Sequence, residues 1–241
     1  MKYIIFVLIL FSCTNQKKRA ELEMIKKNHE SRIKLIRLLP DPMEKKVPDS
    51  MRKWIPVMRN VLADDQMYRI IAVKRTKEDL SKQKVLDSVN LKLITSFIDQ
   101  YGWPVNFNMG LFGFRAVGMT IQHAPVEVQT KYYPALLKAA REDTLLREFL
   151  ALLEDRINVR NNRCQYYGTQ VMTYKGKQVV FPVCYPDSIE IYRANYKLMT
   201  MEDYLKLLKG SWNKKQYLQL LPELRKHFQV SDSMGLHAQI R

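Results

Sequence analysis

Apolar residues recur every three or four positions along most of the chain, a spacing that places them on one face of a helix. The pattern therefore predicts a mainly α fold. Proline and glycine mark several helix ends, because proline lacks a backbone donor and glycine accepts a left-handed conformation. Residues 40–49 are predicted to form a loop, and 75–83 carry no clear structural signal. Helices are expected at about residues 18–39, 57–74, 85–101, 110–123, 134–142, 145–158 and 213–228, with shorter ones from Asp187 and after Thr200.

The period changes near residue 165, where residues suited to strands predict one small β-hairpin. The hairpin would cover about residues 165–181, with its turn at Lys175-Gly176-Lys177. On its first strand Gln165, Tyr167 and Thr169 would share one face. The fold class expected from the whole pattern is a multi-helix domain with this hairpin.

Two cysteines flank the predicted hairpin, and their spacing leaves a disulfide open. A hairpin centred on Gly176 would bring Cys164 closer to Ser188 than to Cys184. A disulfide requires Cα atoms within about 7 Å of each other. Whether Cys164 and Cys184 are bonded therefore cannot be derived from this register.

The first thirteen residues have the organisation of a bacterial lipoprotein signal. Lys2 precedes an apolar run over residues 3–11, which is long enough for a secretory signal and too short to span a bilayer. Leu10-Phe11-Ser12-Cys13 then matches a lipobox, in which the cysteine sulfur receives the lipid. The alternative is an ordinary secretory signal with an incidental cysteine. We expect an exported protein anchored to a bacterial membrane by lipid on Cys13, at the outer membrane if the source is Gram-negative.

A formal net charge of +16 raises the question of an anionic partner. No RNA-recognition, zinc-finger or helix-turn-helix signature accompanies the charge in the sequence, so we expect no nucleic-acid partner. Attraction to anionic lipid is the simpler explanation for a lipid-tethered protein, and a basic N-terminal helix could supply it. The alternative is that these charges only solvate a helix face. The expected regions are a signal peptide (1–12), a lipidated N-terminus with the basic amphipathic helix (13–50), a helical domain with the hairpin (51–230) and a polar tail (231–241).

The sequence lacks the standard motifs of catalysis and cofactor binding. It has no P-loop, no dinucleotide-binding glycine pattern, no nucleophile elbow, no His-Glu-x-x-His and no Cys-x-x-Cys. Its four histidines show no metal-ligand spacing, so we expect neither a metal nor a cofactor. These absences do not exclude an enzyme.

Polar residues instead gather in five short motifs along the chain. They are Asp65-Gln66 with Arg69, Tyr101-Gly102-Trp103-Pro104, Gln122-His123-Ala124 with Gln129, Asp155-Arg156 and Tyr167-Gly168-Thr169-Gln170. In this order they resemble a bacterial domain-of-unknown-function family, number 6624, over roughly residues 60–205. The resemblance implies a mostly helical domain with a small hairpin, often secreted or lipid-anchored, and it supplies no reaction. The family usually has glycine before the last motif, where this chain has Asn161-Asn162, and asparagine tolerates the same left-handed turn.

Residues of these motifs are the candidates for a functional site. His123 and Asp155 are the candidate catalytic residues, because a helix C-terminus favours a protonated histidine and a carboxylate can orient it. The candidate ligand-binding residues are Trp103, Gln122, His123, Arg156, Gln165, Tyr167, Thr169 and Gln170.

Three functions stay open at this point. An envelope binding module would hold a polar small molecule or an envelope component with these amides, hydroxyls and rings. We favour it because the sequence shows no nucleophile or metal set. A hydrolase or transferase would instead use His123 and Asp155 as an acid–base pair in one cleft. In the third alternative the polar residues only tie helices to the hairpin, and they would then be buried and bonded to one another.

Overall fold

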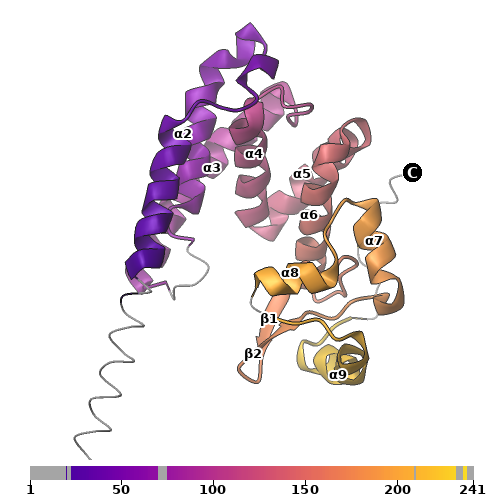
Figure 1. Cartoon of the computed structure of the whole chain (residues 1–241). Coiled ribbons are helices and arrows are strands. Elements are labelled where there is room, and N and C mark those ends of the chain that lie inside the picture. The colour runs from indigo at the N-terminus through magenta and orange to yellow at the C-terminus, as the bar shows by residue number, and fades with distance from the viewer. Residues whose placement is uncertain (1–19, 21–22, 70–74, 209, 232–235, 238–241) are drawn as a thin grey trace, which may run out of the picture. The chain divides into compact units, whose positions relative to one another are not determined.

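The computed structural model describes residues 20, 23–69, 75–208, 210–231 and 236–237, and in that range it confirms a mainly α fold with one small β-hairpin (Figure 1). The predicted signal peptide and Cys13 lie outside the described residues. The chain forms two compact units. The N-terminal unit contains the described residues up to Gln100 together with Phe107–Thr120, and the C-terminal unit contains Tyr101–Asn106 and the described residues from Ile121 onward. Each unit is described by itself.

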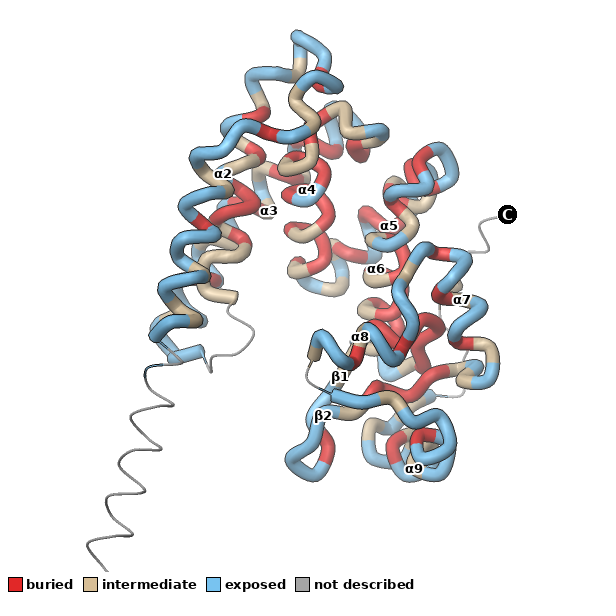
Figure 2. Tube along the Cα trace, in the orientation of Figure 1, coloured by how far each residue is buried: buried red, intermediate tan, exposed pale blue. Residues whose placement is uncertain are grey.

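Helices build the N-terminal unit. Residues 23–38 are helical and end before Pro40, as the sequence predicts. Two 3-10 turns, η1 (Glu44–Lys46) and η2 (Asp49–Trp54), follow, and then come α2 (Ile55–Gln66), α3 (Lys77–Tyr101) and most of α4 (Gly110–His123). Buried positions alternate with exposed ones along each helix (Figure 2). The fully buried side chains of Met58, Ile94 and Phe97 form the centre of this unit.

Helix α3 begins at Lys77, inside the stretch 75–83 that carries no clear signal in the sequence, so the predicted start at about residue 85 is wrong. The reason is a reciprocal cap: Asp79 N donates to Thr76 Oγ1, and Thr76 N donates to Asp79 Oδ2, both at 3.0 Å. Such a cap satisfies backbone donors that a helix start leaves free. Helix α2 ends at Gln66, earlier than the predicted residue 74.

Asp41 caps helix α4 from a distant part of the chain. Its carboxylate accepts hydrogen bonds from Leu111 N at 2.8 Å and Phe112 N at 2.7 Å. Gly110 has φ +69°, and a Cβ there would lie 2.5 Å from the Asp41 carboxylate. Only glycine therefore lets the carboxylate approach the helix start this closely.

The C-terminal unit joins a helix pair to a smaller cluster around the hairpin. Helices α5 (Val126–Glu142) and α6 (Arg147–Arg160) pack together, linked by the 3-10 turn η3 (Thr144–Leu146). The hairpin strands β1 (Val171–Tyr174) and β2 (Lys177–Val180) are antiparallel. The remaining elements are η4 (Pro186–Ser188), α7 (Ile189–Asn195), α8 (Met201–Leu207) and α9 (Lys214–His227).

Pro134 lies inside α5 and does not open a helix, which corrects the predicted start at residue 134. The helix begins at Val126, directly after Pro125. Proline in a helix interior costs about 3 kcal/mol. Here the buried side chains of Tyr133, Leu136 and Ala140 lie on the helix around the proline, and packing of this kind can outweigh intrinsic helix propensity.

The hairpin is shorter than predicted, because residues 165–170 do not continue strand β1. Val171 pairs with Val180 and Tyr174 with Lys177, around a turn in which Lys175 and Gly176 have φ of +47° and +75°. Upstream of the hairpin, Gln165 forms an isolated parallel bridge with Val183, and Arg163 forms another with Ser231.

The bridge between Gln165 and Val183 brings the two cysteines together. Cys164 and Cys184 form a disulfide with a Cα–Cα distance of 5.1 Å. The hairpin register placed Cys164 nearer to Ser188, and this expectation is wrong because strand β1 begins only at Val171, so the hairpin pairing does not reach back to Cys164.

Candidate functional site

The Asp155 carboxylate binds the segment that was predicted to be the first hairpin strand. Tyr166 N, Tyr167 N and Thr169 N donate to it at 2.8, 3.1 and 2.9 Å, and Thr169 Oγ1 donates at 2.9 Å. Gly168, with φ +67°, lets the backbone turn around the carboxylate. The alternating strand face predicted for Gln165, Tyr167 and Thr169 is therefore not formed, because the segment is a loop wrapped around Asp155.

The buried Arg193 side chain binds a backbone carbonyl group of the same segment, whereas Asp155 binds its backbone amides. Arg193 is 1% exposed, and its guanidinium donates to Tyr167 O and to Met199 O. Tyr204 OH donates to Thr169 O at 2.6 Å. The amide groups of the loop thus face a carboxylate, while carbonyl oxygens at residues 167 and 169 face donors.

Burial raises the pKa of Asp155 to about 6, although the hydrogen bonds from Thr169, Tyr167 and Tyr166 lower it. The side chain is fully buried, and both of its oxygens accept hydrogen bonds from this loop. A histidine that needed this carboxylate as an orienting partner would have to compete with those donors.

Gln165 ties the loop to the chain after the hairpin. Its amide nitrogen donates to Gln170 O at 3.0 Å and Phe181 O at 2.7 Å, while its amide oxygen accepts from Gln170 N at 2.9 Å. Gln170 is half-buried, and its amide donates to Thr169 Oγ1 at 3.0 Å. Gln170 thus bonds to its neighbour in the loop, and Gln165 bonds both to Gln170 and to Phe181 after the hairpin. The preceding turn keeps the left-handed geometry expected for asparagine, with Asn162 at φ +52°.

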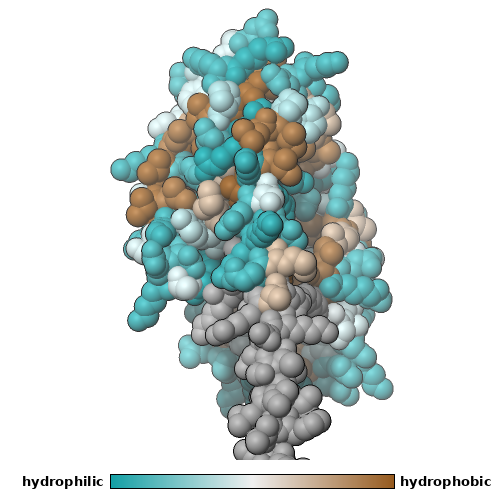
Figure 3. All heavy atoms as spheres, turned by 60° about the vertical axis from the view of Figure 1, so that its left-hand side comes forward, coloured by the Kyte–Doolittle hydropathy of each residue, from teal (hydrophilic) through white to brown (hydrophobic). Residues whose placement is uncertain are grey.

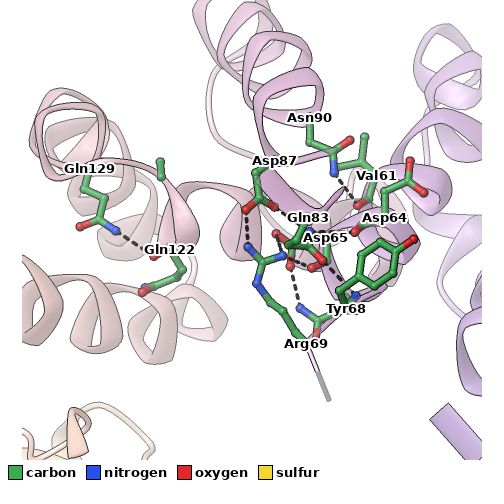
Figure 4. A network of polar contacts seen from close by, with 12 residues as sticks. Val61, Asp64, Asp65, Tyr68, Arg69, Gln83, Asp87, Asn90, Gln122 and Gln129 are labelled. Carbon is green, nitrogen blue, oxygen red and sulfur yellow. Dashed lines mark hydrogen bonds and ion pairs between the residues drawn. The ribbon is translucent and has the colours of Figure 1, made fainter. Parts of the chain in front are cut away.

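A second predicted group surrounds the C-terminal end of α4. Gln122 O accepts from Arg156 NH1 at 2.7 Å. It also accepts from Gln129 Nε2 at 2.8 Å (Figure 4). Arg160 NH1 donates to Ala124 O at 2.7 Å. Carbonyl groups at a helix end lack partners in the helix. These side chains therefore serve to satisfy backbone groups.

Trp103 and His123, the two candidate ring side chains nearby in the sequence, differ from each other in exposure. The Trp103 side chain is buried, at 7% exposed. His123, at the end of α4, is half-buried. The buried amide oxygens of Gln122 and Gln129 find no donor among the described residues.

The motif Asp65-Gln66 with Arg69 belongs to a network in the N-terminal unit (Figure 4). Arg69 NH2 donates to Asp87 Oδ2 at 2.7 Å, and Gln83 Nε2 donates to Asp87 Oδ1 at 2.8 Å. The same Gln83 amide accepts from Tyr68 N at 3.0 Å and donates to Asp64 O at 3.1 Å. The network fixes the turn after α2 against the side of α3.

Glu154, which the sequence did not single out, lies in a polar centre next to Asp155. Its side chain is fully buried, with Tyr133 OH donating at 2.5 Å and Tyr167 OH at 2.7 Å. Burial, and then the neighbouring Glu154 charge, raise the pKa values of Tyr133 and Tyr167. Both phenols therefore keep their protons and serve as donors.

Aromatic rings extend from this centre to the C-terminal end of the described chain. The His237 ring stacks on the Tyr166 ring, with centroids 4.2 Å apart and planes 12° from parallel. His237 Nδ1 lies 3.4 Å from Tyr167 OH, and Tyr192 meets the imidazole edge-on at 5.3 Å. We call Tyr166, Tyr167 and Tyr192 the tyrosine cage. It holds a planar ring next to the hydroxyl that binds Glu154.

Two signals could have pointed to this centre. Glu154 falls on the apolar face of a helix otherwise marked by Leu150, Leu153 and Ile157, where an unpartnered carboxylate is costly. Tyrosines at 166, 167, 185, 192 and 196 also concentrate in one stretch of sequence. His237 gave no signal, because it lies in a tail predicted only as polar. Among the described residues no group of three or more histidine, cysteine, aspartate or glutamate side chains could hold a metal ion.

Asp155→Asn is expected to lower the free energy of unfolding at pH 8 by about 3 kcal/mol. At that pH the parent carboxyl is ionised, and the new amide nitrogen would face backbone donors. Urea unfolding followed by circular dichroism measures the loss. The control is Asp187→Asn, which removes only an exposed ion pair with Lys214 and should cost less than about 1 kcal/mol. Equal losses in the two variants would contradict the role of Asp155.

His237 is expected to titrate at a lower pH in the native chain than in the chain unfolded by urea. Burial lowers its pKa from 6.5, and the groups facing it are Tyr166, Tyr167, Tyr192 and, through Tyr167, Glu154. The docked ring then binds fewer protons than the released one, so docking contributes stability above pH 6.5 that is lost as the pH falls below it. Proton NMR of the imidazole measures both midpoints. A native midpoint at or above the unfolded one would mean that the Glu154 charge outweighs burial.

A sequence model of a family of unknown function, DUF6624, matches residues 70–216. The match covers more than half of the chain, including Glu154, Asp155 and the loop around that carboxylate. No curated protein and no solved structure matches the chain. The chain therefore belongs to the DUF6624 family, whose function is unknown.

Proposed function

We propose that the protein is a lipoprotein of the bacterial cell envelope that binds a ligand carrying a planar ring and does not turn it over. The anchor would be lipid on Cys13, and the binding site would be the tyrosine cage of the C-terminal unit. The observation that carries the binding proposal is the stacked imidazole of His237, 4.2 Å from the Tyr166 ring. The site already accommodates a ring of this size and polarity.

The N-terminal helix supports contact with a membrane surface. Met24, Leu35 and Leu38 are 58, 50 and 65% exposed, and helical spacing places them on one side of this helix. Exposed lysines and arginine at 27, 32 and 34 flank that side. Figure 3 shows hydrophobic side chains among hydrophilic ones on the face of the N-terminal helices. Apolar and basic groups in this arrangement suit an anionic lipid surface.

The anchor itself is supported by the lipobox of the sequence, only ten residues before the described helical segment begins at residue 23. Such a helix would start close to the bilayer if Cys13 is lipidated. Among the described residues, no helix is both long enough and apolar enough to cross a membrane.

Binding is favoured over the hydrolase or transferase alternative because Asp155, one of the two candidate acid–base residues, is buried and already hydrogen-bonded. Asp155 has four hydrogen bonds from Tyr166, Tyr167 and Thr169 and is fully buried. An acid–base residue needs access to the proton that it moves. The tyrosine cage instead offers ring faces and hydroxyl groups, which recognise planar polar molecules.

Cys13→Ser is expected to abolish incorporation of labelled palmitate into the protein. The reason is that serine offers no thiol for the diacylglyceryl group. The matched control, Thr14→Ser, should leave labelling unchanged. An unlabelled parent chain, or a Cys13→Ser chain that still takes up the label, would remove the lipoprotein part of the proposal.

His237→Gly is expected to open a space in the tyrosine cage that free imidazole fills. Added imidazole should raise the melting temperature of the variant saturably, whereas the parent chain should respond little because its own ring occupies the site. Tyr166→Leu in the same background removes the stacking surface and should abolish the response. No difference between the parent and His237→Gly over the imidazole titration would argue against a ring-binding site.

A further inference from the structure

The C-terminal segment contacts its groove in the way that a bound peptide contacts a protein. Leu236 N donates to Asn158 Oδ1 at 2.7 Å, and Asn158 Nδ2 donates to Leu236 O at 2.9 Å. One side-chain amide thus pairs with both polar groups of one backbone residue, as a neighbouring strand would. The contact depends on the peptide backbone and not on the leucine side chain.

The next residue inserts its ring into the tyrosine cage. His237 stacks on Tyr166 and places Nδ1 3.4 Å from Tyr167 OH. We call the surface made by Asn158 and the tyrosine cage the tail groove. It combines backbone pairing at one position with ring stacking at the next, which is a recognition pattern for an extended polypeptide.

The described residues of the tail, Leu236 and His237, lie outside the buried cluster around the hairpin. That cluster includes Tyr217 and Leu224 of α9, with Phe228 packed against it, and none of its described members follows Phe228. Directly after α9 the chain pairs with the turn that follows α6, through Ser231 N donating to Asn162 O at 2.6 Å and a bridge between Arg163 and Ser231. Departure of Leu236 and His237 would therefore leave that cluster intact.

The groove can also open without leaving polar groups unpaired. Once exposed, the Asn158 amide and the Tyr167 hydroxyl would bond to water, so the hydrogen bonds to Leu236 and His237 add little net stability. The ring stack on Tyr166 adds a modest further contribution. Leu236 and His237, held by these bonds and ring contacts, can therefore exchange with a competing peptide.

We propose that the tail groove is an exchangeable binding site for an extended polypeptide segment of another envelope protein. The segment would carry an aromatic or imidazole side chain directly after the residue that pairs with Asn158. The chain's own Leu236–His237 is the resting occupant. This inference rests on the proposed function, since it names the ligand class of the same tyrosine cage.

If the tail competes for the groove, the Kd of a free peptide depends on whether the tail is present. A tethered segment has an effective concentration on the order of 1 mM. A free peptide must displace it, so removing the tail should tighten peptide binding about tenfold or more. A site filled only by small heterocycles would show no preference for a peptide backbone.

The test compares the full chain with a chain ending at Ser231. The probe is a fluorescein-labelled peptide of residues 232–241, and fluorescence anisotropy measures its Kd. The shortened chain should bind the peptide at least tenfold more tightly than the full chain does. A His237→Ala peptide, or Asn158→Asp in the shortened chain, should weaken binding at least tenfold. Asn161→Ala is the matched control, because its amide bonds to Ile157 O of its own helix, and it should change nothing.

Several results would overturn the proposal. The proposal is wrong if the shortened chain folds but binds no peptide. It is also wrong if the Asn158→Asp variant of the shortened chain binds the peptide as tightly as the unchanged shortened chain does. If the shortened chain does not fold, the full-length His237→Ala chain decides the question. A His237→Ala chain that folds and binds the peptide supports the proposal. A His237→Ala chain that is unfolded or does not bind the peptide overturns it, and unfolding would mean that the tail belongs to the core. Imidazole rescue of His237→Gly without peptide binding would leave the ring site standing and remove only the peptide inference.

Discussion

The arrangement of the C-terminal unit depends on one buried carboxylate. Residues 166–169 run through the interior without strand or helix partners, so their backbone groups need other hydrogen bonds. Asp155 accepts from the amides of Tyr166, Tyr167 and Thr169, and Arg193 donates to the Tyr167 carbonyl. Neither ion could be buried at low cost alone, but each is paired with the backbone. The positions of the Tyr166 and Tyr167 rings follow from this arrangement, and the tyrosine cage and the Glu154 centre follow from those rings.

Helical periodicity predicted most of the architecture because the helices bury one face and expose the other. The expected bounds of α4 agree with Gly110–His123. The failures have local physical causes. Thr76 and Asp79 start α3 through their own side chains, in a stretch without apolar periodicity. Pro134 looked like a helix start, yet α5 continues through it, where tertiary contacts outweigh the missing backbone bond.

The sequence grouped Asp155 with the motif at residues 167–170, and the structure shows Asp155 bonded to Tyr167 and Thr169 of that motif. Their role as a functional site stays a prediction. Alternation of side chains along the sequence suggested a strand where the carboxylate imposes a loop. A polar residue that bonds to backbone cannot be distinguished in the sequence from one that contacts a ligand. The contact between His237 and Tyr166 joins residues far apart in the sequence. No local pattern reports such a pairing, so the tail was described only by its polarity.

The disulfide between Cys164 and Cys184 encloses both the loop around Asp155 and the hairpin, with a sequence separation of 20. Closing a loop of that length in the unfolded chain contributes about 3 kcal/mol to stability in the chain-entropy model. The reduced polypeptide, with both thiols free, lacks this contribution. The segment that the disulfide then no longer constrains is the one that positions the tyrosine rings. The unit therefore reaches its full stability only where thiols are oxidised, which couples the positioning of the tyrosine cage to the redox state of the surrounding compartment.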